Sequence, residues 1–204
     1  MPNWCSNNME IIFPTKKEKK RFIKESTREE KLEFDTTWHK KGHTLKGFSF
    51  DALIPMPKQL EGIHHGMTTI NGKEYSHWRE VTGDDGEVKE IPITNLMLEQ
   101  IRRRHGYTFS NYWKINNWGT KWDVFYDDVV LSDHGDIGIQ VSFETAWSPP
   151  EGIFNYIYEN FECDIEVEFD EPGVGFKGNY YNGEMNIIDY THKDWKQLEL
   201  ELGD

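Results

Sequence analysis

The sequence predicts an α+β fold, and three patterns carry that prediction. Residues 137–143 and 163–170 each alternate apolar with polar side chains, which is the period of a strand with one buried face. Between them, residues 148–161 combine a Ser-Pro-Pro-Glu start with apolar residues at helical spacing. Together these patterns indicate helices packed on one face of a sheet.

The chain begins with a strand and a helix. Residues 8–13 form a short apolar strand that stops at Pro14, because proline cannot donate a hydrogen bond to a sheet. Thr15 and Glu18 then have capping-box spacing, which predicts a helix to about residue 27. Residues 32–94 lack sustained periodicity, so we expect an insertion there with few regular elements.

Local signals within and after the insertion are few. Phe48 to Ile54 is the one segment of it that favours a strand. Its turn signals are Asn71-Gly72 and Asp85-Gly86. A helix follows, capped by Thr94 and ending before Gly106.

The second half predicts a regular series of elements. Trp122 to Leu131 forms a strand that pairs as a hairpin with residues 137–144, and the helix at 148–161 and the strand at 163–170 come next. Asn182-Gly183 then marks a tight hairpin, before a final helical stretch around Trp195.

This order of elements matches a known plan. From residue 7 it is β, α, insertion, β, β, α, β, with an appended hairpin. That is the ferredoxin-like βαββαβ plan, in which two helices cover one face of an antiparallel sheet and the other face stays open. We predict a single α+β domain over residues 1–204, interrupted by an irregular insertion at about 32–94.

Charge restricts the partners of this chain. Residues 106–204 hold 20 of the 36 acidic residues and five of the 23 basic ones. Such a surface repels phosphate backbones and anionic lipid, so nucleic acid is disfavoured as a partner and a basic protein surface is favoured. The sequence contains no leader and no apolar run long enough to span a membrane, and its two cysteines suit a reduced compartment, so we expect a cytoplasmic protein.

Motifs for catalysis or metal binding are not recognisable. No nucleophile elbow, Cys/His signature or phosphate-binding loop occurs. Two histidine pairs, His39 with His43 and His64 with His65, match no strong metal template, and solvated surface residues explain them better. We therefore expect no cofactor, no metal and no catalytic residues, and the sequence leans away from an enzyme.

Two tryptophan-rich strings are the candidate binding site. The string 116–123 places two tryptophans four residues apart around a glycine, with Lys121 between the indoles and Asp123 as its charge partner. Buried indoles at a strand entry explain this string about equally well. A second string, 145–150, leaves the other strand of the same hairpin, so both should meet at one end of the sheet. The predicted binding residues are Trp4, Asn117, Trp118, Lys121, Trp122, Asp123 and Trp147.

Several strings together resemble one family. They are residues 1–7, 54–57, 117–123, 145–150 and 171–178. In them the chain resembles the YubB-like family of phage- and plasmid-borne proteins. The resemblance implies a ferredoxin-like C-terminal domain and a mobile-element setting, and it implies no catalytic residues.

The leading functional expectation is a non-enzymatic protein-interaction module in a bacterial cytoplasm. A specific form is an acidic decoy, in which the carboxylates of residues 162–171 imitate nucleic-acid phosphates and occupy a basic site; a solvated sheet face is the plainer alternative. The second hypothesis is a small-molecule-binding protein or enzyme that uses the Trp118–Trp122 and Trp147 site.

Overall fold

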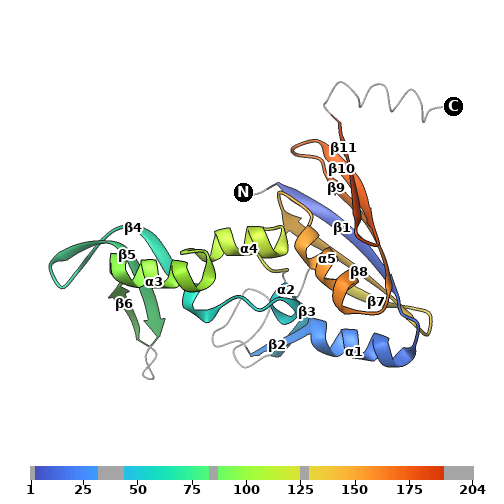
Figure 1. The fold of residues 1–204 in the computed structure, drawn as a ribbon, viewed down its shortest axis with the longest axis horizontal. Coiled ribbons are helices and arrows are strands. Elements are labelled where there is room, and N and C mark those ends of the chain that lie inside the picture. The colour runs from blue at the N-terminus through green and yellow to red at the C-terminus, as the bar shows by residue number, and fades with distance from the viewer. Residues whose placement is uncertain (1–2, 32–43, 83–86, 125–128, 191–204) are drawn as a thin grey trace. The chain divides into compact units, whose positions relative to one another are not determined.

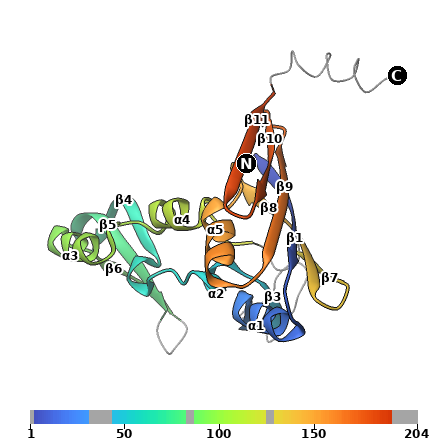
Figure 2. The same ribbon diagram turned by 45° about the vertical axis from the view of Figure 1, so that its right-hand side comes forward.

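The computed structural model describes residues 3–31, 44–82, 87–124 and 129–190. The chain forms two compact units. The main unit comprises Met1–Pro55 and Asn117–Asp204, and the inserted unit comprises Met56–Asn116. Figure 1 shows the ribbon, and Figure 2 shows the same ribbon turned by 45°.

A six-stranded antiparallel sheet is the centre of the main unit (Figure 1). Its strands are β1 (Trp4–Ile12), β7 (Val130–His134), β8 (Gly138–Ala146), β9 (Asp164–Glu171), β10 (Phe176–Tyr181) and β11 (Glu184–Asp189). Across the sheet they follow the order β11-β10-β9-β1-β8-β7. β1 therefore lies between β8 and β9, and both neighbours run antiparallel to it.

Alternating side chains give this sheet one buried face and one open face. Met9 pairs with Val141 on one side and Val167 on the other, and all three side chains are fully buried. The outward residues Glu166 and Glu168 are exposed, so the predicted acidic outer face of β9 is confirmed. The strands predicted at 8–13, 137–144 and 163–170 are present, and β1 begins four residues earlier than predicted.

Two helices cover the buried face, as expected. They are α1 (Lys16–Ser26) and α5 (Glu151–Asn160). Thr15 caps α1, because its Oγ1 accepts the backbone N–H of Glu18 at 3.2 Å. Phe22 of α1 meets Phe161, the residue after α5, edge to face at 5.1 Å between ring centroids. This contact places both helices on the same side of the sheet.

The Ser-Pro-Pro-Glu start predicts Ser148 as the cap of α5, and this prediction is wrong. The residue at its N-cap is Pro150, which makes no side-chain capping hydrogen bond. A residue before proline is disfavoured in the helical region, so Ser148 and Pro149 stay outside the helix. The Ser148 hydroxyl instead donates to the carbonyl oxygen of Gly119 at 2.7 Å.

Two predicted strands are also wrong in part. Phe48 ends β3 (Thr44–Phe48), which pairs with β2 (Thr27–Lys31), and Ser49 then caps the short helix α2 (Phe50–Leu53). Trp118 ends the helix α4 (Ser110–Trp118), residues 119–122 form a bend, and residues 122–124 are not in a strand although the predicted strand begins at Trp122. Gly119 explains that bend, because its φ of +90° stops the helix and a Cβ there would lie 2.7 Å from the backbone nitrogen of Glu151.

The insertion is more regular than predicted. The inserted unit contains η1 (Lys58–Leu60), β4 (Ile63–Ile70), β5 (Lys73–Thr82), β6 (Val88–Pro92) and α3 (Asn95–His105). Its three strands pair with one another in the order β4-β5-β6. Asn71 and Gly72 join β4 to β5 with φ values of +51° and +75°, as their turn signal predicted. These strands are largely exposed, so they lack the apolar alternation by which a strand is recognised in sequence.

Some of the remaining predictions are confirmed, and the others fall on residues outside the described ranges. Thr94 caps α3 and Gly106 closes it with a φ of +79°, as expected. Asn182-Gly183 forms the predicted turn between β10 and β11. Asp85-Gly86 and the helical stretch around Trp195 lie outside the described residues. No helix in the described ranges is long and apolar enough to cross a membrane.

Candidate functional site

Three tryptophans from distant parts of the sequence meet at one end of the central sheet. The ring centroids of Trp4 and Trp122 are 6.2 Å apart, and those of Trp122 and Trp147 are 5.4 Å apart. The Lys121 ammonium lies 5.3 Å from the Trp122 ring and 5.4 Å from the Trp147 ring, within cation–π range. We call these four residues the indole cluster. Trp4 and Trp147 remain 37% and 40% exposed, so the cluster is a surface feature.

The backbone around Trp147 aims its indole toward the cluster. Trp147 has a φ of +66°, which is uncommon for a residue with a bulky side chain. Its N–H donates to the carbonyl oxygen of Asn3 at 2.9 Å, and the Thr145 hydroxyl donates to the carbonyl oxygen of Ser148 at 2.8 Å. Such outliers concentrate at functional sites, because the surrounding structure must hold them in place.

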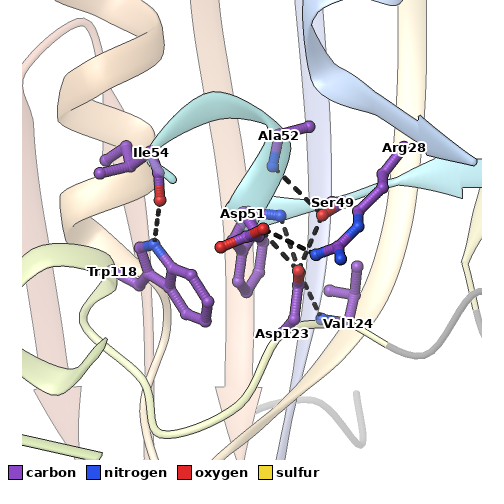
Figure 3. A network of polar contacts seen from close by, with 9 residues as sticks. Arg28, Ser49, Asp51, Ala52, Ile54, Trp118, Asp123 and Val124 are labelled. Carbon is purple, nitrogen blue, oxygen red and sulfur yellow. Dashed lines mark hydrogen bonds and ion pairs between the residues drawn. The ribbon is translucent and has the colours of Figure 1, made fainter. Parts of the chain in front are cut away.

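Trp118 is part of the core rather than of the indole cluster. It is 1% exposed, and its indole N–H donates to the carbonyl oxygen of Ile54 at 2.9 Å (Figure 3). Its ring also packs edge to face on Phe50. Asn117, the residue before it, packs its backbone against α5, since a Cβ on Gly152 would lie 2.2 Å from the Asn117 carbonyl oxygen.

Asp123 does not pair with Lys121, and the structure contradicts that prediction. Its carboxylate accepts the backbone N–H of Phe50 at 2.7 Å and the hydroxyl of Ser49 at 2.7 Å, at the start of α2 (Figure 3). The N–H groups of Asp51 and Val124 complete its set of donors. Local sequence could not reveal this arrangement, because α2 is more than 70 residues away along the chain.

The open face of the sheet continues from the indole cluster and is acidic. Glu144, Glu166 and Glu168 lie on it, and within the described part of the chain no ion pair joins any of them to a cation. A hollow of about 690 Å³ lies over β1, β9, β10 and β11, and a second of about 420 Å³ lies beside Trp4. Both hollows are lined by Ser6 and Asp170.

Glu171 is the site residue that sequence reasoning missed. It is fully buried at the edge of the smaller hollow. One carboxyl oxygen, Oε2, accepts the N–H of Val174, whereas Oε1 has no hydrogen-bond partner within the described ranges. The alternation of inward and outward side chains along β9 could have identified it, since residue 171 continues the inward series of Ile165, Val167 and Phe169.

The thiols are free and poorly ionised. Cys5 and Cys163 form no disulfide. Burial raises the pKa of the Cys5 thiol to about 12 and that of Cys163 to about 11. Neither thiol is therefore activated as a nucleophile at neutral pH.

The histidines of the inserted unit form pairs across two strands. His65 Nδ1 and His77 Nε2 lie 3.1 Å apart, and His64 stacks on Trp78. Desolvation, and secondarily the neighbouring His65, lowers the pKa of His77. Among the described residues no three His, Cys, Asp or Glu side chains come together as metal ligands. His39 and His43 lie outside the described residues.

One comparison with known proteins identifies the class of domain in this chain. Residues 125–203 match the family model described as a ferredoxin-like domain in Api92-like protein. The main unit, with its mixed α and β content and antiparallel sheet, thus contains a ferredoxin-like domain.

Two further comparisons find individual proteins that this chain resembles. The chain is 30% identical over 94 residues to the uncharacterized protein YubB of Escherichia coli strain K12, a match that covers 45% of this chain and 64% of that protein. The chain thus spans less than two thirds of this relative. It also resembles the crystal structure of the protein api92 from Yersinia pseudotuberculosis, with 12% identity, a TM-score of 0.45, and coverage of 94% of this chain and 99% of that one. The match to YubB confirms the predicted resemblance over those 94 residues.

Proposed function

We propose that this chain is a non-enzymatic protein-interaction module that binds a basic protein surface with the open face of its central sheet. The observation that carries the proposal is the set of carboxylates on the open face that form no ion pair with any described residue, next to exposed indoles. We place its action in a bacterial cytoplasm and its origin in a phage or plasmid. The matched relative from Escherichia coli supports the bacterial setting.

The chemistry of the open face fits a cationic protein partner. Glu166 and Glu168 on β9 and Glu144 on β8 create a negative potential that attracts basic surfaces and speeds their association. Exposed tryptophans supply the large, rigid contact area that anchors typical interfaces. Nucleic acid lacks the electrostatic attraction, because its phosphates would face carboxylates.

The proposal includes the finer description of the fold. The strands β9-β1-β8-β7 have the order expected of a βαββαβ plan, with β10 and β11 appended beyond β9. In that plan the helices leave the opposite face of the sheet free for binding. The decoy form of the proposal also uses this face, where the outward residues of β9 would take the place of phosphates in a basic site.

Affinity purification from a bacterial host tests the proposal. We expect the tagged full chain to recover a protein with a basic surface, and recovery to fall with rising salt because the attraction is screened. The charge-reversed double variant Glu166→Lys with Glu168→Lys should lose that protein. The matched control is Glu151→Lys with Glu159→Lys, two exposed positions on α5, which changes the charge by the same amount and in the same sense on the helix-covered side of the sheet. Loss of the partner in the control and not in the β9 variant would refute the proposed surface.

A second candidate function is binding of a small molecule beside the indole cluster. The hollow of about 420 Å³ next to Trp4 favours it, because that volume suits a metabolite-sized ligand. A metabolite that co-purifies with the native chain, without any protein partner, would favour this function over the first. Mass spectrometry of the ligand released from the purified protein makes the distinction.

A further inference from the structure

Resting on the proposed function, we infer that the hollow beside Trp4 binds one guanidinium group, the head of an arginine side chain on the partner. The hollow lies between the start of β1 and the turn after β9, and its volume is about 420 Å³. The residues that line it and carry the inference are Asn3, Trp4, Ser6, Glu144, Asp170 and Glu171.

The buried carboxyl group of Glu171 is the strongest sign of a missing donor. This residue is 0% exposed, and no donor from the described residues reaches its Oε1, although Oε2 accepts the N–H of Val174. Buried polar atoms nearly always have partners in native proteins, so an oxygen without one at the wall of a hollow indicates that a ligand supplies the donor. Gly173 lets the Asn3 side chain approach the wall beside this oxygen, since a Cβ at residue 173 would lie 2.5 Å from Asn3 Cγ and 2.9 Å from Glu171 Oε1.

Two further carboxylates flank the same hollow. Glu144 on β8 and Asp170 on β9 both stand directly opposite Ser6 on β1, so a small residue separates two acidic ones. Asp170 Oδ1 accepts the hydroxyl of Tyr190, which leaves its other oxygen for a ligand. Lys177 on β10 stands opposite Asp170 and is a cation that faces this row. The carboxyl groups still outnumber it.

The shape and chemistry of the hollow favour arginine over lysine. A guanidinium is planar and carries five N–H donors in a fixed fork, so it can reach carboxyl oxygens on several sides at once. It also stacks on aromatic faces, and Trp4, a residue that is 37% exposed, lines the hollow. An ammonium is a compact charge with strong hydration and gains less from an indole wall.

A titration of the full chain with Nα-acetyl-arginine methylamide tests the inference. The citrulline and lysine counterparts serve as ligand controls, because citrulline has the same shape without the charge. Binding is followed by the chemical shift of the Trp4 indole N–H and by calorimetry. We expect saturable binding of the arginine derivative, at least about tenfold weaker binding of the citrulline derivative, and intermediate binding of the lysine derivative.

Variants locate the binding within the hollow. Glu144→Gln and Glu171→Gln should each weaken binding of the arginine derivative about tenfold. Glu166→Gln removes the same charge on the same face outside the hollow, so its affinity should stay within about twofold of the native chain. Glutamine at 171 can still accept the N–H of Val174, and a melting curve checks that the fold is kept. If that variant nevertheless unfolds, the exposed Glu144 decides the outcome.

Some results would overturn the inference. They are the absence of saturable binding, equal binding of the citrulline derivative, or an equal loss in Glu166→Gln. If a basic protein partner still binds the native chain while the arginine derivative does not, this inference fails and the proposed function stands. If the arginine derivative binds in the hollow but no protein partner is recovered, the proposed function fails and the pocket remains.

Discussion

Removing the carboxylate of Asp123 should destabilise the main unit while leaving the indole cluster intact. The Asp123 carboxylate accepts from the Ser49 hydroxyl and from the N–H groups of Phe50, Asp51 and Val124. Loss of a helix cap costs about 1 kcal/mol, and a hydrogen bond to a charged group contributes about 1.5–3 kcal/mol. The site is half-buried, so water replaces part of what is lost. We therefore expect Asp123→Ala to cost about 3–4 kcal/mol in the free energy of unfolding, and Asp123→Asn about 1–2 kcal/mol because one acceptor oxygen remains.

Urea denaturation followed by tryptophan fluorescence measures this change, since Trp118 packs on Phe50 at the start of α2. The matched control is Glu168→Ala, which removes an exposed carboxylate with the same charge and should change stability by less than about 0.5 kcal/mol. A cost below about 1 kcal/mol for Asp123→Ala, or an equal cost for Glu168→Ala, would show that Asp123 does not hold α2 in place.

The remaining predictions concern burial and titration. Trp118→Ala should cost about 3–5 kcal/mol in urea denaturation because its indole is buried in the core, whereas Trp122→Ala should cost about 1–2 kcal/mol because Trp122 is only half-buried; equal costs would contradict the division into a core indole and a half-buried one. Cys5 and Cys163 should react very slowly with a thiol reagent at pH 8 in the folded chain and quickly in urea, since their pKa values near 12 and 11 leave little thiolate; fast native reaction would contradict this. The pKa of His77 in an NMR titration should fall below that of an unfolded histidine. Because the unfolded state then binds the proton more readily, this contribution to stability is complete above about pH 6.5 and is lost as pH falls through the folded pKa.

The sheet was the part of the fold that could be predicted best from the sequence. Residues 163–170 alternate because one face of β9 is buried and the other is open, and that physical cause acts residue by residue along a strand. The inserted unit offered no such signal, since its strands are exposed on much of their surface. Its turns were still visible, because Asn71-Gly72 must adopt positive φ wherever it joins two strands.

The candidate site was predicted partly for the wrong reason. Trp122 and Trp147 do meet, but Trp122 arrives after the turn at Gly119 and not on the predicted strand. Trp4, Lys121, Trp122 and Trp147 come together, whereas Asn117, Trp118 and Asp123 have structural roles. Sequence separates these cases poorly, because whether an indole or a carboxylate finds partners depends on segments far away in the chain. Whether the cluster binds a partner stays a prediction.

The hydrogen bond from Trp118 to Ile54 has a consequence for how the chain tolerates change in length. It joins two residues 64 positions apart, next to the points where the chain leaves the main unit and returns to it. The main unit therefore fixes both ends of the intervening segment. The packing of the main unit does not depend on the length of that segment. Loop-closure entropy rises only with the logarithm of length, so doubling that segment would cost about 0.6 kcal/mol. This joint is a place where evolution can lengthen, shorten or exchange the inserted unit at little cost to the core.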